Sequence, residues 1–227
     1  MARVHSLAPA NHFALPAVLQ NPDDPPAKQA VLGVALHLFT RQGVAGTNVR
    51  QIAAAAGFTN PIIFKYFDSK EGLARALFER CYEELVSTLF VSVDLEEPFS
   101  ENVLRFVTRY TELLGRAPVI PVFVLTQARD LASGLPPRLK RRPLPAAFQE
   151  LLASGQRQSQ VTDQVSLPLL AVCLLGILES VSLAVYRRDL RGSLASLRRE
   201  LSEVIIALVR PLMVSKRSTK VRTDLFE

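Results

Sequence analysis

Hydroxyl, amide and cationic side chains gather along the short stretch between Thr47 and Lys70. Hydroxyl groups and cations bind phosphate oxygens, an Asn amide can pair with an adenine edge, and an apolar side chain can pack on a thymine methyl group. The residues that we expect to contact DNA are Thr47, Arg50, Thr59, Asn60, Pro61, Ile62, Phe64, Lys65 and Lys70. These residue types suit a nucleic-acid surface, although short amphipathic helices with a glycine turn also occur in ordinary helical proteins.

Each role has a simpler alternative. Thr47 can bind phosphate or only cap a helix, and Ile62 can contact a thymine methyl group or belong to the core. Asn60 is the side chain suited to adenine, and Lys65 suits either phosphate or a guanine edge. Lys70 opposes the helix dipole in a first turn, at a cost of about 0.3–1 kcal/mol, unless a phosphate lies beside it. We therefore expect Lys70 to contact the DNA backbone rather than solvent alone.

The spacing of apolar residues in this stretch predicts two short helices joined by a tight turn. Thr47 is expected to cap the first helix, and Gly57 to end it in the left-handed conformation. Thr59 is expected to cap the second helix, with Pro61 in its first turn. This is a helix-turn-helix, whose second helix is the candidate reader of the major groove.

The run IIFKYFDSKEGL, from Ile62 to Leu73, resembles the TetR (tetracycline-repressor) family of bacterial regulators, and the match extends over Ala27 to Leu89. In that family a short recognition helix ends in a tyrosine-rich aromatic run, followed by Phe, a linker residue and Ser-Lys-Glu. The family commonly has Gly, Thr and Tyr where this chain has Pro61, Ile62 and Phe64. These departures bear on the base sequence that is recognised rather than on the mode of docking.

The apolar periodicity predicts an all-α fold with a helix-turn-helix head and a helical body, and the resemblance implies that this body binds a ligand and dimerises. We expect a flexible arm over 1–23, the DNA-binding domain over 24–94, the effector-binding and dimerisation domain over 95–215, and a basic tail over 216–227. Body helices are expected over 99–114, 119–132, 146–158, 167–188 and 193–214, with a proline-rich basic loop over 134–145.

The last two predicted helices suit a dimer, because one has a wide apolar stripe and the other is apolar all round. The resemblance implies a four-helix interface; the alternative is that both helices pack within one chain. The expected interface residues are Leu197, Leu201, Val204, Ile205 and Leu208.

The resemblance also implies a small, mostly apolar effector inside the body. The expected pocket residues, each of which can instead belong to the core, are Phe106, Tyr110, Phe123, Gln127, Phe148, Cys173, Gly176 and Ser180. Glu179 is expected to pair with an arginine at an interface or to recognise a cation. The basic run 138–142 suits either an anionic effector or a solvated loop.

Composition limits the function classes. The chain of 227 residues carries a net charge of +6, which permits nucleic-acid binding, and 48% hydrophobic residues, which is ample for a core. Cys81 and Cys173 are expected to be buried thiols rather than a disulfide. The apolar segment 167–185 is expected to be a buried helix rather than a membrane span. The sequence contains no recognisable group of catalytic residues, metal-ligand cluster or cofactor motif. We expect a cytoplasmic bacterial protein that associates with the nucleoid when it binds DNA.

The sequence thus predicts a homodimeric DNA-binding regulator, a repressor that a small molecule releases from a palindromic operator. One alternative is a DNA-binding regulator with no effector, whose body serves dimerisation or a protein partner. A second alternative is an enzyme with an all-α body, which the missing catalytic groups disfavour.

Overall fold

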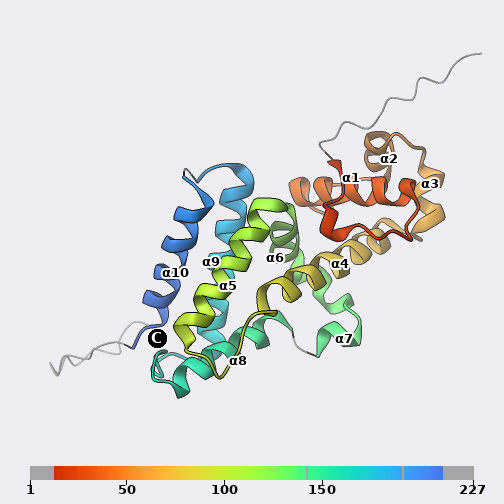
Figure 1. The fold of residues 1–227 in the computed structure, drawn as a ribbon. Coiled ribbons are helices and arrows are strands. Elements are labelled where there is room, and N and C mark those ends of the chain that lie inside the picture. Colours follow the sequence, from red (N-terminus) through yellow and green to blue (C-terminus); the bar gives the residue numbers. More distant parts are fainter. Residues whose placement is uncertain (1–12, 142, 191, 212–227) are drawn as a thin grey trace, which may run out of the picture.

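The structure is a computed structural model that describes residues 13–141, 143–190 and 192–211. Over these ranges the chain is helical and contains no strand, which confirms the all-α prediction. A small head of three helices sits at one end of a larger helical body, and one long helix runs from the head into the body (Figure 1). The predicted basic tail over 216–227 lies outside the described residues.

The head consists of α1 (Pro26–Gln42), α2 (Val49–Ala56) and α3 (Asn60–Tyr66). Each helix turns its apolar row inward, so that Phe39, Ile52 and Ile63 are fully buried together in one core. Gly57 ends α2 at φ 75°, as predicted for a left-handed cap. The head is therefore a compact helix-turn-helix on a third helix, and α3 lies at its edge (Figure 1).

The segment expected to be a flexible arm is partly packed. Residues 13–24 lie along α1 and include a short 3-10 helix, η2 (Ala17–Leu19), whose Leu19 is buried together with Leu15. The segment crosses α1 at Gly33, where an added Cβ would lie 2.3 Å from the Phe13 carbonyl oxygen. The flexible-arm prediction is thus wrong for residues 13–23, because two leucines four positions apart bury themselves on the head.

Helix α4 (Lys70–Phe90) belongs to both the head and the body. The body adds α5 (Phe99–Arg116), α6 (Val119–Leu131), η3 (Ala132–Gly134), α7 (Pro137–Lys140), α8 (Leu144–Arg157), α9 (Leu167–Arg187) and α10 (Leu194–Val209). The stretch predicted as a proline-rich loop over 134–145 therefore contains one short helix and the first turn of another, since Pro fits the opening positions of both.

A buried polar contact joins two body helices. The Tyr110 hydroxyl on α5 donates to the Leu178 carbonyl oxygen at 2.6 Å and lies 2.7 Å from the Ser182 hydroxyl oxygen, both on α9. Burial raises the pKa of Tyr110 well above its usual range, so the hydroxyl stays protonated. Because a buried hydroxyl needs a partner, this contact fixes how α5 and α9 face each other.

Three aromatic rings connect the head to the body. Phe123 on α6 stacks on Phe39 of α1 with ring centroids 6.4 Å apart, and it meets Phe78 of α4 edge-on at 6.2 Å. All three rings are fully buried. A body helix thus touches the helix-turn-helix domain directly, and α4 is a second connection between them.

The apolar surfaces of α9 and α10 are largely exposed in a single chain. Leu169, Val172 and Cys173 of α9 and Val204 of α10 are all exposed, so the prediction that Cys173 is buried is wrong for the isolated chain. By length and composition, α9 alone among the described helices could cross a membrane, although core helices of soluble proteins pass the same test. Only 28% of its most apolar window is buried, so this helix leaves much apolar surface uncovered.

Candidate functional site

The N-terminus of α2 is capped by Asn48 and not by Thr47. The Asn48 side chain accepts from the Gln51 amide at 2.9 Å, and the Gln51 side chain accepts from the Asn48 amide at 3.0 Å. Thr47 is buried, and its hydroxyl donates to the Gly43 carbonyl oxygen at 2.8 Å. The predicted cap is therefore wrong by one residue, and the Thr47 hydroxyl is buried and engaged by Gly43 and Gln42.

The sequence nevertheless contained a signal for this cap. Asn followed three positions later by Gln is a capping-box pattern, in which two free amides are satisfied reciprocally. Asn48 and Gln51 are exposed beside Arg50, which forms no ion pair with any described residue. Two polar residues that the sequence reading missed thus stand next to the predicted phosphate contact.

Helix α3 exposes three of its seven residues and fully buries one. Ile63 is fully buried, whereas Phe64, on the next position, is 51% exposed. Thr59 precedes the helix with its hydroxyl free of any capping bond, and Pro61 and Lys65 are exposed. The remaining predicted readers, Asn60 and Ile62, are half-buried. The structure therefore brings the predicted α3 contacts together on one short helix, and most of them are open to a partner.

Lys70 has a protein partner. Its ammonium donates to the Thr47 carbonyl oxygen at 2.9 Å, and its side chain is 20% exposed. The Glu71 carboxylate lies 3.9 Å from the ammonium, beyond hydrogen-bond distance, so the bond to Thr47 leaves donors for a phosphate. Lys70 thus connects the start of α4 to the turn before α2, and any DNA contact that it makes is oriented by that bond.

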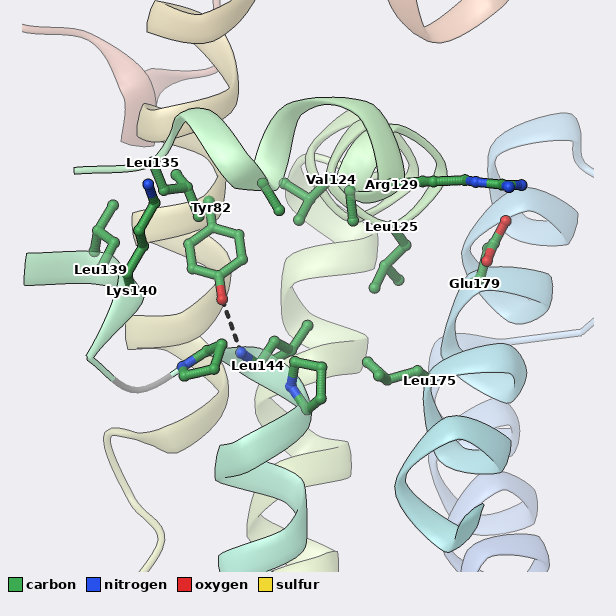
Figure 2. Close-up of a pocket in the computed structure, with 14 residues that line it drawn as sticks. Tyr82, Val124, Leu125, Arg129, Leu135, Leu139, Lys140, Leu144, Leu175 and Glu179 are labelled. Carbon is green, nitrogen blue, oxygen red and sulfur yellow. Dashed lines mark hydrogen bonds between the residues drawn. The ribbon is translucent and has the colours of Figure 1, made fainter. Parts of the chain in front are cut away.

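The body contains a cavity of about 410 Å³ beside α4, α6 and α9 (Figure 2). Its walls are mostly apolar, with three charged side chains among them. The lining residues are Tyr82, Val124, Leu125, Ala128, Arg129, Ala132, Leu135, Leu139, Lys140, Pro143, Leu144, Pro145, Leu175 and Glu179. A cavity of this size and character suits a small organic ligand.

None of the eight predicted pocket residues lines this cavity. Phe106, Tyr110, Phe123 and Phe148 are buried in the core, and Phe106 and Phe148 pack edge-on with centroids 5.3 Å apart. Cys173, Gly176 and Ser180 lie on the exposed side of α9, and Gln127 is half-buried. The predicted set therefore does not coincide with this cavity, and Phe106 and Phe148 border only a gap of about 10 Å³ in the core.

The cavity wall is tied to α4 by polar contacts. The Tyr82 hydroxyl of α4 accepts from the Leu144 amide at 2.7 Å, and both residues line the cavity (Figure 2). Burial raises the pKa of Tyr82 above its usual value, although the Leu144 bond opposes the shift. On the same side, Arg138 of α7 pairs with Glu79 and Glu83 of α4. The segment that forms one wall is therefore held against the helix that leads to the head.

The predicted dimer residues fall on two faces of α10. Leu201 and Ile205 are buried where α10 packs on α5, so they are corrected from interface to core residues. Val204 and Leu208 are exposed, and Leu197 is half-buried. In Figure 1, α9 and α10 lie at the end of the body away from the head. The exposed half of the predicted stripe thus remains available to a second chain.

Comparisons with known proteins agree with the fold. Residues 31–77 match the profile of bacterial regulatory proteins of the tetR family. An uncharacterised HTH-type transcriptional regulator of Mycobacterium tuberculosis is 30% identical over 101 residues, 44% of this chain and 50% of that protein. The chain thus spans about half the length of that relative.

Two further similarities cover more of the chain. An HTH-type transcriptional repressor of Streptomyces coelicolor is 24% identical over 68% of this chain and 78% of its own length. The crystal structure of the MbdR regulator from Azoarcus superimposes with a TM-score of 0.64 at 21% identity, covering 79% of this chain and 97% of that one. The N-terminal helix-turn-helix domain thus matches the tetR family of bacterial regulatory proteins, and the all-helical chain as a whole has a TetR-like fold.

Proposed function

We propose that this protein is a sequence-specific DNA-binding transcriptional regulator that acts as a homodimer. The observation that carries the proposal is the outward face of α3, where Pro61, Phe64 and Lys65 are exposed on a short helix whose Ile63 is fully buried. A helix held this way, with Arg50 on the neighbouring helix, can enter the major groove while its flanks contact phosphates.

Two features support a dimer: the uncovered apolar surface of α9 and α10, and the short length of the recognition helix α3. Val204 and Leu208 on α10, together with Leu169 and Val172 on α9, are exposed apolar side chains that a second copy would cover. One recognition helix of seven residues reads few base pairs, whereas a twofold pair about 34–36 Å apart reads a palindrome. The proposed operator is therefore palindromic.

We further propose that the protein is a repressor whose effector occupies the cavity beside Tyr82. Helix α6 supports a path to the head, because Val124, Leu125 and Ala128 line the cavity while Phe123 contacts Phe39 of α1. A ligand that prefers one arrangement of α6 and α4 shifts the spacing of the two heads. The alternative without an effector keeps the dimer and leaves the cavity unused.

Selection of bound sequences from random duplex DNA tests the DNA-binding proposal. The purified full-length chain should enrich a palindrome with half-sites about one helical turn apart, and Phe64→Ala should change the enriched sequence. Salt-sensitive binding without an enriched sequence would refute sequence-specific recognition. A ligand that fills the cavity should then weaken binding to the selected palindrome, and no change in operator affinity on ligand binding would favour the alternative without an effector.

A further inference from the structure

The charged side chains of the cavity are distributed unevenly between its two ends. At one end Arg129 of α6 points toward Glu179 of α9, so a positive and a negative group face each other (Figure 2). At the other end Lys140, at the C-terminus of α7, stands among Leu135 and Leu139. The two ends therefore offer a ligand different electrostatic environments.

Lys140 has no countercharge in the described part of the chain. It forms no ion pair with a described acidic residue, and the two nearby carboxylates on α4, Glu79 and Glu83, are both engaged by Arg138. Glu179, the acidic residue of the lining, lies at the Arg129 end. Lys140 is thus a cation beside an apolar cavity without an opposing carboxylate of its own.

The space between the two ends is apolar. The Tyr82 ring, Val124, Leu125, Leu144 and Leu175 form its walls. The Tyr82 hydroxyl accepts from the Leu144 amide and keeps its own hydrogen as one neutral donor at this wall. The volume of about 410 Å³ lies within the range of small-molecule sites. An apolar chain or ring system of about ten carbons with one polar end matches this size.

We propose that the cavity binds an apolar molecule with a single anionic group, and that Lys140 selects the charge. The apolar part lies between Tyr82 and Leu175, and the anion pairs with the ammonium at the α7 end. The inference rests on the proposed function only in taking this cavity as the effector site, because binding to the cavity requires no DNA. Arg129 and Glu179 place one positive and one negative group at the far end, so that end carries no net charge to favour an anion or a cation.

The test displaces a fluorescent probe from the purified full-length protein without DNA. The probe is N-phenyl-1-naphthylamine, which is uncharged and therefore does not favour either end. Decanoate, decan-1-ol and decylamine then compete at neutral pH, so that chain length stays constant while charge changes. We expect decanoate to displace the probe at the lowest concentration and decylamine at the highest.

Lys140 is exposed, so substitutions there should leave the fold intact. Lys140→Gln should weaken decanoate binding about three- to five-fold, as expected for a partly solvated ion pair, and change decanol binding less than about two-fold. Lys140→Glu should make decylamine the better competitor. The matched control is Arg141→Gln, which removes a charge from the neighbouring exposed residue outside the lining and should change nothing.

Three outcomes would overturn the inference. Equal competition by decanoate and decanol would show that the cavity does not select charge, and preference for decylamine would make Glu179 the selecting residue. Failure of the probe and of all competitors to bind would show that the cavity does not take this class of ligand. Ala128→Leu narrows the cavity and should therefore lower the affinity for the probe. That result would show that the probe binds in this cavity. None of these results depends on the DNA-binding proposal, which the selection experiment tests separately.

Discussion

Replacing Lys70 by Ala separates its two possible roles. The structure gives its ammonium a hydrogen bond to the Thr47 carbonyl oxygen at 2.9 Å and a longer ion pair with Glu71 at 3.9 Å, so donors remain for a phosphate. Each phosphate contact contributes about 0.9 to the slope of log K against log salt, so losing one contact in each half of a dimer should lower that slope by about 1.8. Losing the bond to Thr47 should separately reduce the free energy of unfolding by about 1–2 kcal/mol.

Both quantities are measurable on the same variant. Fluorescence anisotropy of a labelled operator duplex at several salt concentrations gives the slope, and urea unfolding gives the stability. The matched control is Arg157→Ala, which removes one exposed positive charge at the end of α8, far along the chain from the head. If Lys70→Ala lowers stability but keeps the wild-type slope, Lys70 is a structural residue of the head and the phosphate role is refuted.

Asn60→Ala should reduce discrimination between bases at one position of each half-site by about 1–3 kcal/mol, measured by repeating the DNA selection with the variant. An equal loss of affinity for all DNA sequences would contradict base readout. Gly33→Ala should destabilise the head by about 1–3 kcal/mol in urea unfolding, because the added Cβ would lie 2.3 Å from the Phe13 carbonyl oxygen. If the variant is as stable as the wild type, residues 13–15 move away from α1 at little cost. Burial lowers the pKa of His37 below its ordinary 6.5, against the opposing bond with the Ala14 backbone. Its contribution to stability should therefore be complete above pH 6.5 and decline as pH falls toward the lowered pKa, and His37→Gln should remove that part of the pH dependence in thermal unfolding.

The head was largely predictable from sequence because its constraints are local. Gly57 needs a left-handed cap, and Ile63 can only face inward on so short a helix. Thr47 and Asn48 are adjacent and both suit the cap of α2, so residue type alone does not choose between them. The Gln51 side chain decides in favour of Asn48. Gly33, inside a helix where glycine is unfavourable, was a local sign that another backbone passes close by.

The faces of α10 could not be assigned from sequence alone. Leu201 and Ile205 are four positions apart and form the row that packs on α5, whereas Val204 and Leu208 form the adjacent row that stays exposed. Both rows lie within one wide apolar stripe, so periodicity does not distinguish a neighbour in the same chain from a partner chain. Only the position of α5 separates core from candidate interface.

The cavity is the least predictable feature, because a cavity is defined by what the surrounding side chains fail to fill. Phe123 and Val124 are consecutive on α6, and successive helical positions point about 100° apart. One therefore meets the head at Phe39 while the other lines the cavity. A small rotation of α6 changes both contacts at once, and close-packed rings favour discrete positions over gradual displacement. If α6 transmits the effector signal, Phe123→Leu should leave ligand affinity nearly unchanged and weaken the effect of the ligand on operator binding. If the ligand acts through α4 alone, its effect on operator binding should be the same in Phe123→Leu as in the wild type.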